Sequence, residues 1–270
     1  MTHRSKRLSR NVIIENQEVC SGYFRMRIAC GCGFKYAIPG QFVMIRSPGQ
    51  TAPLLSRPFS IHNLIIEESG TVSVDILYKI VGAGTLKLSQ LLPGDQIDVL
   101  GPLGRGFSIR DDCKQVYFVA GGIGIAPFVF LGKQLIRKGI QSDQITIFIG
   151  GQTSGDLLCL GIFEGMGSDL KLTTDDGSSG QQSLVTKPLE AAIAKARPDI
   201  IYACGPIPML REVMKLSEQR NIPCQVSIET MMACGMGACL GCAVEQTKTH
   251  NSYLHACKDG PVFNASRIVL

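Results

Sequence analysis

The chain has 270 residues, a length that suggests about two domains. Hydrophobic residues make up 45% of it and charged residues only 18%, which excludes a disordered or highly solvated protein. Part of the net charge of +5 is local, because Arg4, Lys6, Arg7 and Arg10 all precede the first acidic residue, Glu15. We interpret this basic stretch as a solvated terminus rather than as a targeting segment or a site for an anionic partner, and we expect no nucleic-acid binding.

Short β-type runs separated by turn residues dominate the first hundred or so residues. The runs cover residues 12–14, 23–28, 41–45 and 71–78, and turns such as Pro39-Gly40 and Pro93-Gly94 punctuate them. One short helix is expected over residues 86–92. Regularly spaced short strands of this kind predict a small antiparallel β-barrel, which we assign to residues 1–110.

The pattern changes after residue 110. A continuous apolar run at residues 115–120 is typical of a buried parallel strand. The further strands expected are 144–149, 170–173, 199–203 and 225–228, and the expected helices are 127–138, 189–196 and 208–220. This alternation predicts a doubly wound α/β domain, which we assign to residues 111–228. Glycines and Pro127 interrupt the apolar run at 116–131, so we expect no membrane span.

Two glycine-containing turns follow predicted strands of this second domain. Residues 121–127 read Gly-Gly-Ile-Gly-Ile-Ala-Pro, and Cys204-Gly205-Pro206 ends a later strand. Because ligands of open α/β sheets bind beyond the carboxyl ends of the strands, both turns are expected to border one nucleotide site. No Arg or Lys follows the strand at 144–149 to hold a 2′-phosphate, and Asp156 is nearby, which favours NAD over NADP.

The barrel also contains residue types that suit a ligand. Arg57-Pro58-Phe59-Ser60 offers a cation for phosphate, an aromatic side chain for a ring face and a hydroxyl for a ring nitrogen. Lys79 and the Gly-Thr pair before the short predicted helix offer a second phosphate contact. From the residues alone, Arg57 fits a surface ion pair equally well.

Four cysteines near the C-terminus form the most specific motif of the chain. Cys234, Cys239 and Cys242 have the spacing C-x4-C-x2-C, and Cys257 follows downstream, as in plant-type [2Fe–2S] sites. A zinc site usually has two short pairs of ligands, so three crowded cysteines and one distant cysteine fit zinc less well. We assign residues 229–270 to a cluster-binding segment and expect it to follow the sheet as an appendage.

The other seven cysteines form no set, and we interpret them as buried thiols in a reducing compartment. The N-terminus shows no apolar signal sequence, which makes a disulfide framework unexpected. Together these features predict a cytoplasmic location.

The order of the motifs resembles that of the ferredoxin–NAD(P) reductase superfamily. Arg-Pro-Phe-Ser, a Gly-Thr pair before a short helix, Leu-Pro-Gly-Asp, the Gly-Gly-Ile-Gly turn and Cys-Gly-Pro follow one another along the chain. The tail from Glu229 to Cys242, with Cys257-Lys-Asp-Gly-Pro-Val-Phe, is similar to that of the electron-transfer subunits of NAD-dependent (class 1B) dihydroorotate dehydrogenases. The resemblance covers nearly the whole chain beyond the first ten residues.

The resemblance implies an oxidoreductase subunit with one FAD and one [2Fe–2S] cluster, and a partner, the FMN-containing catalytic subunit, in a heterotetramer of two of each. Electrons would run from dihydroorotate to the FMN, through the cluster and FAD, to NAD⁺, in pyrimidine biosynthesis. The implied FAD contacts are Arg57, Pro58, Phe59, Ser60, Leu77, Tyr78, Lys79, Gly84 and Thr85. The implied nucleotide contacts are Gly122, Gly124, Cys204 and Gly205. The implied cluster ligands are Cys234, Cys239, Cys242 and Cys257. The superfamily often has Tyr where Phe59 stands, so a phenolic hydroxyl is missing here.

No acid–base constellation for substrate chemistry is visible. His3, His62, His250 and His255 form no group, and we interpret His62 as structural. We therefore expect no catalytic residue in this chain, since substrate oxidation would belong to the partner. Two alternatives remain: a related FAD/[2Fe–2S] reductase subunit, linked to ferredoxin:NADP, sulfite or sulfide chemistry, and a zinc-stabilised nucleotide-binding module.

Overall fold

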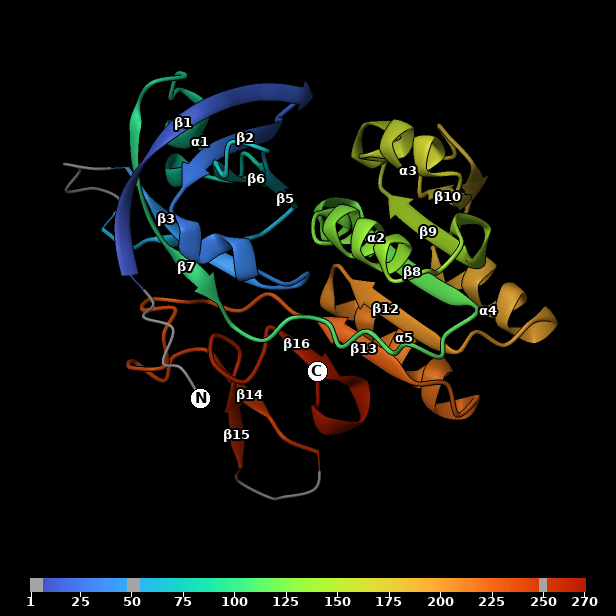
Figure 1. The fold of residues 1–270 in the computed structure, drawn as a ribbon. Helices are drawn as coiled ribbons and strands as arrows, with labels where there is room; N and C mark the ends of the chain where they lie inside the picture. Colours follow the sequence, from blue (N-terminus) through green and yellow to red (C-terminus); the bar gives the residue numbers. More distant parts are fainter. Residues whose placement is uncertain (1–6, 48–53, 248–251) are drawn as a thin grey trace.

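The computed structural model describes residues 7–47, 54–247 and 252–270. His3, Arg4, Lys6 and His250 lie outside these ranges. Two seven-stranded sheets stand side by side, and the C-terminal segment lies beneath both of them in the view of Figure 1. We call the two parts the barrel and the nucleotide-binding half.

The barrel consists entirely of antiparallel strand pairs, as predicted. Its strand order is β4-β3-β7-β1-β2-β6-β5. The strands are β1 (Arg7–Cys20), β2 (Tyr23–Cys30), β3 (Phe42–Arg46), β4 (Arg57–Ser60), β5 (Asn63–Ile66), β6 (Val72–Lys79) and β7 (Gln96–Leu103). The two edge strands β4 and β5 are consecutive in the chain, and the N–H groups of Ile61 and His62 between them donate to Gln41 O and Asp75 O. These bonds curl the sheet around its buried core.

The short helix of the barrel begins earlier than predicted. Helix α1 spans Ala83–Ser89 instead of residues 86–92. The Thr85 hydroxyl accepts the Val81 N–H at 2.9 Å, and this bond starts the helix where the sequence alone suggested a loop. Gly84 and Thr85 therefore lie within its first turn.

The nucleotide-binding half has the doubly wound α/β arrangement that the alternating pattern predicted. Its strand order is β11-β10-β9-β8-β12-β13-β16, parallel except at β16. The parallel strands are β8 (Val116–Gly121), β9 (Ile145–Gly151), β10 (Asp169–Thr174), β11 (Gln181–Gln182), β12 (Ile200–Cys204) and β13 (Cys224–Ser227). Helices α2 (Phe128–Arg137) and α3 (Leu160–Met166) lie on one face, and α4 (Thr186–Lys195) and α5 (Ile207–Gln219) on the other (Figure 1). No described helix is long and apolar enough to cross a membrane.

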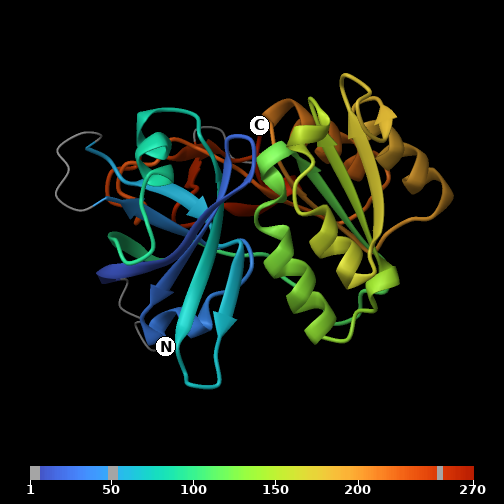
Figure 2. The same cartoon turned by 90° about the horizontal axis from the view of Figure 1, so that it is seen from above.

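The C-terminal segment is integrated into the fold, so the expectation of an appendage was wrong. Strands β14 (Ala243–Glu245) and β15 (Tyr253–His255) form a hairpin, and β16 (Val262–Asn264) pairs antiparallel with β13. Cys242 and Cys257 are buried in one hydrophobic core with Met44 of the barrel and Val226 of the sheet. The segment thus packs against both halves at once (Figure 2). The physical reason is that β16, which begins with the apolar residues Val262 and Phe263, pairs with the otherwise open edge of β13.

Candidate functional site

A cavity of about 250 Å³ lies between the barrel and the nucleotide-binding half; we call it the barrel-side cavity. It collects most of the barrel residues predicted to contact FAD. These are Arg57, Pro58, Phe59, Ser60, Leu77, Tyr78, Lys79 and Thr85. Gly84 does not line it. A Cβ on Gly84 would lie 2.7 Å from Arg57 Nε, so this glycine makes room for the guanidinium instead.

Buried aromatic side chains fix the wall of the barrel-side cavity. The Phe59 ring packs edge-on against Tyr78, with 5.7 Å between centroids. The Tyr78 hydroxyl donates to Asn16 Oδ1 at 3.0 Å, and burial raises the pKa of Tyr78 above its usual range. Tyr78 is therefore a neutral support for Phe59. On the same wall, the Arg57 guanidinium donates to Leu55 O, which holds its charge at the cavity edge.

The nucleotide-binding half supplies the opposite wall, including residues that sequence reasoning missed. Glu229 and Thr230 directly follow the β13 end of the sheet and line the barrel-side cavity. The Thr230 hydroxyl oxygen is buried and has no hydrogen-bond partner among the described residues. An unpaired buried hydroxyl at a cavity wall suits a polar ligand atom. The signal for both residues was their place just after a strand end.

A larger cavity of about 600 Å³ opens beside the first; we call it the nucleotide-side cavity. It is lined by three of the residues predicted to contact the nucleotide, Gly122, Gly124 and Gly205, and also by Gly150 and Gly151 at the end of β9. Thr173 lines it too, and the buried Thr173 hydroxyl has no partner among the residues that the structure describes. Cys204 lies elsewhere, since its side chain lines the barrel-side cavity.

The glycines of the two turns have two different tasks. A Cβ on Gly124 would lie 2.2 Å from Cys204 O, so the turns can pack against each other only if residue 124 lacks a side chain. Gly122 has φ +51° and no heavy atom within 4 Å of a Cβ, which leaves its backbone open to the cavity. Gly124 thus serves the packing of the protein, whereas the backbone at Gly122 is open to a ligand.

Lys79, Ile123 and Glu229 line both cavities, so the two cavities meet at these residues. Glu229 is accessible from the cavities, yet the protein around it removes enough water to raise the pKa of its carboxyl. Burial also raises the pKa of the neighbouring Cys204 thiol to about 12, with a further contribution from Glu229, so Cys204 stays a neutral thiol. The junction of the cavities therefore holds a carboxyl group with a raised pKa beside a neutral thiol.

Asp156, the acidic residue noted from the sequence, lines the nucleotide-side cavity, and so does Asp175. Asp156 Oδ1 accepts hydrogen bonds from Tyr23 and Lys79, and its Oδ2 accepts two backbone N–H groups, so its carboxylate is fully engaged. Asp175, just beyond the end of β10, lines the same cavity, and no described residue pairs with its carboxylate. The Asp175 carboxylate is therefore open to a ligand, whereas the Asp156 carboxylate is not.

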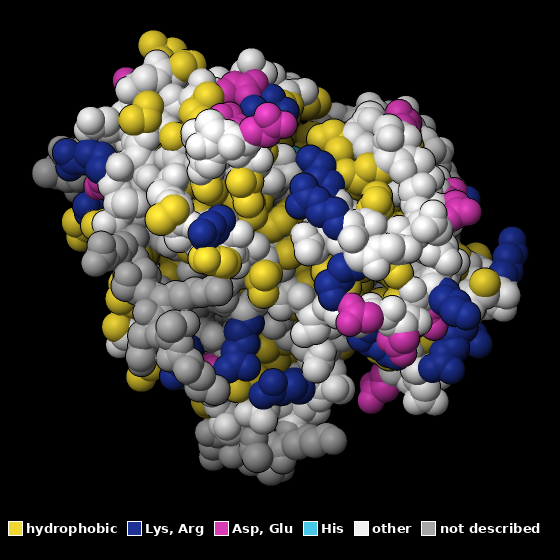
Figure 3. Space-filling model, in the orientation of Figure 1, with side chains coloured by type: hydrophobic (Ala, Val, Ile, Leu, Met, Phe, Trp, Pro, Cys, Tyr) yellow, Lys and Arg dark blue, Asp and Glu magenta, His cyan; other side chains and the backbone are white. Residues whose placement is uncertain are grey.

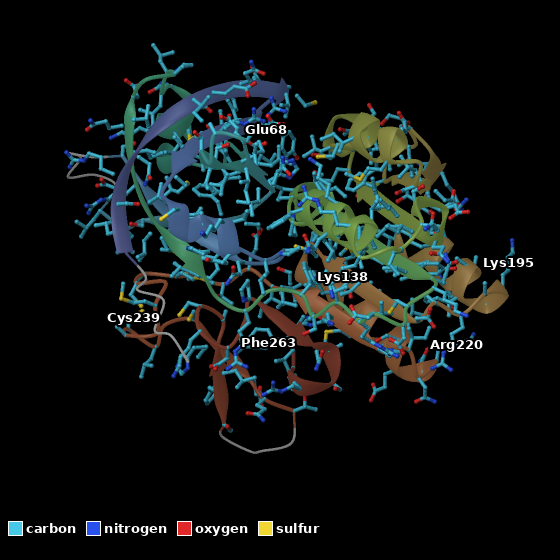
Figure 4. The ribbon with its side chains drawn as sticks, in the orientation of Figure 1. Glu68, Lys138, Lys195, Arg220, Cys239 and Phe263 are labelled. Carbon is cyan, nitrogen blue, oxygen red and sulfur yellow. The ribbon has the colours of Figure 1, made fainter. Side chains whose placement is uncertain are left out.

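The four predicted cluster cysteines lie in one segment as two pairs. Cys242 Sγ and Cys257 Sγ are 3.2 Å apart, and Cys234 and Cys239 neighbour each other in a loop at the edge of the molecule (Figure 4). Positive φ angles at Gly235 and Gly237 turn the N–H groups of Met236, Ala238 and Cys239 toward Cys234 Sγ, at 3.3–3.5 Å. Within the described ranges, no three His, Cys, Asp or Glu side chains converge closely enough to hold a metal ion.

The donor set fits an iron–sulfur cluster nevertheless. Burial tends to raise the pKa of Cys234, but the three N–H groups outweigh it and lower the pKa to about 6, which favours the thiolate that binds iron. Four cysteine thiolates are the ligands of such clusters, and backbone N–H groups commonly bond their sulfurs.

Comparison with known proteins agrees with this geometry. Residues 118–215 match an oxidoreductase NAD-binding domain, and residues 229–269 match the iron–sulfur cluster binding domain of dihydroorotate dehydrogenase B. A solved structure of an NADH-dependent reduced ferredoxin-NADP oxidoreductase has a TM-score of 0.82 and 29% identity, covering 96% of this chain and 89% of that chain. Phthalate dioxygenase reductase shares the fold at a TM-score of 0.59 and 19% identity, over 78% of this chain and 64% of that chain. The fold is thus of the ferredoxin–NADP reductase type.

The curated relatives identify the family more specifically than the fold does. A protein of Caldanaerobacter subterraneus subsp. tengcongensis is 38% identical over 95% of this chain and 96% of its own length. A protein of Clostridium acetobutylicum is 38% identical over 96% of both chains. Both are named the electron transfer subunit of dihydroorotate dehydrogenase B (NAD(+)). The chain therefore belongs to the family of electron-transfer subunits of dihydroorotate dehydrogenase B.

Proposed function

We propose that this chain carries electrons from a catalytic partner subunit to NAD⁺, with a [2Fe–2S] cluster on the four cysteines, FAD in the barrel-side cavity and NAD in the nucleotide-side cavity. One observation carries the proposal: the two cavities meet at Lys79, Ile123 and Glu229, and the cysteine segment continues from the same wall through Thr230 and Met232. The three sites are thereby consecutive in space.

The order of the sites suits the chemistry. A cluster carries one electron at a time and nicotinamide takes a hydride, so FAD supplies the exchange between single electrons and electron pairs when bound. The chain's own residues would bind and orient the FAD. Arg57 and Thr85 would hold phosphate, Phe59 would cover a ring face, and Ser60 would hydrogen-bond near the reacting ring nitrogen. Leu77 and Pro58 would exclude water from the same wall.

On the other side, the open backbone at Gly122 would admit the pyrophosphate of NAD, with Gly205 lining the same cavity. Glu229, whose carboxyl pKa burial raises, lies at the junction of the cavities beside the neutral Cys204 thiol.

The partner is proposed to be the FMN-containing subunit that oxidises dihydroorotate in pyrimidine biosynthesis, joined to this chain in a heterotetramer of two of each. The relatives' name, electron transfer subunit, supports a catalytic partner. A cytoplasmic location fits the eleven cysteines, all of which are free thiols in the structure. For the domains, we retain the boundaries 1–110, 111–228 and 229–270.

The surface proposed to receive the partner is the cysteine loop. Met231, Met236 and Leu240 are exposed there at 90%, 48% and 58%, an unusual density of apolar side chains in ten residues of surface. Met231→Asp is expected to weaken assembly with the catalytic subunit about ten- to thirtyfold, because a charge would be buried against the partner. Binding titrations measure this effect, with Leu92→Asp, at another exposed apolar site (67%), as the control. Equal affinities for both variants would remove the loop from the interface.

The nucleotide preference is proposed to depend on Asp175. Its free carboxylate would accept a hydrogen bond from a ribose hydroxyl of NAD and repel the 2′-phosphate of NADP. Asp175→Asn is expected to lower kcat/KM for NADH about tenfold or more and to raise the NADPH/NADH ratio. Asp176→Asn is the matched control, because the Asp176 carboxylate is already bonded to Ser178 outside the cavity lining. An unchanged ratio in Asp175→Asn would assign selectivity to other residues.

A second candidate is a reductase subunit of another electron-transfer complex. The 29% identity and TM-score of 0.82 with the NADH-dependent reduced ferredoxin-NADP oxidoreductase favour it. The 38% identity with dihydroorotate dehydrogenase B subunits favours the first candidate. Co-purification decides between them, since an FMN protein with dihydroorotate activity should accompany this chain. Iron and acid-labile sulfide should be found with FAD, whereas zinc without sulfide would contradict both candidates.

A further inference from the structure

The tip of the β1–β2 hairpin of the barrel contacts the nucleotide-binding half beside the nucleotide-side cavity. Tyr23 Oη donates to Asp156 Oδ1 at 2.5 Å, and Lys79 Nζ donates to the same oxygen at 3.3 Å. The Cys20 thiol donates to Gly155 O at 3.3 Å. Tyr23, Lys79 and Asp156 all line the cavity, so this contact crosses its mouth from one half of the protein to the other.

Asp156 also holds the loop that follows β9. Its Oδ2 accepts the N–H groups of Gln152 and Thr153, each at 3.2 Å. Gln152 and the adjacent Gly151 line the cavity. The Asp156 carboxylate therefore bonds to the barrel through Oδ1 and to the cavity-lining loop through Oδ2.

The charges of the three side chains favour this contact. Burial raises the pKa of Tyr23, and Asp156 raises it further, so the phenol stays a neutral donor. Burial tends to raise the pKa of Asp156, but its bonds to Tyr23, Thr153 and Lys79 outweigh this and lower the pKa, so the carboxylate stays ionised at neutral pH. The Lys79 ammonium lies 4.7 Å above the centroid of the Tyr23 ring. A charge-assisted bond at a site where Tyr23 is only 3% exposed is stronger than a surface ion pair.

Other contacts join the two halves independently of this one. His62 Nδ1 lies 2.7 Å from Ala126 O, and Lys133 Nζ donates to Asn63 Oδ1 at 3.1 Å. Lys133 belongs to α2, and both contacts remain when the Tyr23 hydroxyl is removed. Loss of the Tyr23 bond would therefore loosen the loop after β9, which Lys79 and Cys20 still contact, without separating the halves. On the face drawn in Figure 3, basic side chains (dark blue) and acidic side chains (magenta) both lie near the boundary between the two halves.

We propose that Tyr23 and Asp156, with Lys79, form an interdomain latch that holds residues 152–156 in the geometry that receives the nucleotide. Tyr23 is a positioning residue that acts through Asp156, and its link to nucleotide affinity rests on the proposed function. The latch keeps the cavity formed before the nucleotide arrives, so binding does not have to order this loop. Its loss should weaken nucleotide binding and leave the bound nucleotide's reaction with FAD largely unchanged.

The test compares Tyr23→Phe with Tyr117→Phe in the complete protein with its cofactors. Tyr117 is buried like Tyr23, but its hydroxyl donates to Ala196 O within the nucleotide-binding half. Tyr23→Phe is expected to raise KM for NADH about tenfold, the effect of one lost charge-assisted bond, with kcat for ferricyanide reduction and FAD content nearly unchanged. Tyr117→Phe should leave KM unchanged. An unaltered KM in Tyr23→Phe, or an equal rise in both variants, would overturn the proposal.

Two further measurements keep the latch separate from the proposed function. Amide hydrogen exchange at residues 152–156 should accelerate in Tyr23→Phe and not in Tyr117→Phe, whatever the protein's substrate is. In an Asp156→Ala background, Tyr23→Phe should have no additional effect on exchange or on KM. Protected amides in Tyr23→Phe would refute the latch, whereas a wild-type protein that NADH does not reduce would refute the proposed function alone.

Discussion

Cys239→Ser is expected to remove most of the [2Fe–2S] absorbance and EPR signal from the protein while FAD remains bound. Serine keeps the size of the side chain but replaces the soft thiolate with a hydroxyl, which is a poor ligand for iron in such clusters. Cys239 is exposed and lies in the loop whose N–H groups bond Cys234 Sγ, away from the walls of the barrel-side cavity. The variant should therefore fold and hold FAD normally.

The same variant separates the two directions of electron flow. NADH should still reduce FAD in Cys239→Ser, because that step passes only through the junction at Lys79 and Glu229. Electron exchange with the partner should fall sharply, because the cluster lies between. Cys32→Ser, at an exposed cysteine outside the segment, is the control. A full EPR signal in Cys239→Ser after reduction would exclude Cys239 as a ligand.

Gly124→Ala is expected to damage the nucleotide-binding half more than other glycine substitutions. The new methyl group would lie 2.2 Å from Cys204 O and 2.5 Å from Cys204 C, and neither backbone atom can move aside easily. We expect a loss of about 1–3 kcal/mol in the free energy of unfolding. Because Cys204 lines the barrel-side cavity and Gly205 the nucleotide-side cavity, the reduction of FAD by NADH should slow as well.

Gly161→Ala is the matched control for this prediction. Gly161 lies in α3, and a Cβ there would meet no heavy atom within 4 Å. Alanine favours the helix at such a site, so the control should be neutral or slightly stabilising. Chemical denaturation measures both variants. Equal stabilities would show that the two turns can separate without cost.

The sequence predicted the main strands and helices because their apolar patterns are strong. Residues 115–120 become the central strand β8, and the alternating run at 71–78 becomes β6. Helix α3 escaped prediction because Gly161 and Gly165 lower the helix propensity of its seven residues. Strand β16 has only three residues, and nothing local shows that it will pair with β13 across more than thirty residues of chain.

The candidate site was predictable where residue type alone determines the chemistry. The four cysteines and the glycine turns belong to that class. Asp156 was the harder case, because its position after a strand favoured NAD over NADP, whereas its two oxygens are engaged by Tyr23, Lys79 and two backbone amides. Tyr23 comes from the barrel, 133 residues away, so only the fold could show that Asp175 is the free carboxylate. Long-range pairing of this kind leaves no local pattern.

The central claim is that this chain passes electrons between the partner subunit and NAD⁺ and does not itself oxidise the substrate. The most direct measurement mixes the purified protein anaerobically with dihydroorotate, with and without the FMN subunit, and follows flavin absorbance and the cluster EPR signal. We expect no reduction by dihydroorotate alone, reduction of both centres once the FMN subunit is added, and bleaching of the flavin by NADH in either case. Reduction by dihydroorotate without the partner, or no response to NADH, would contradict it.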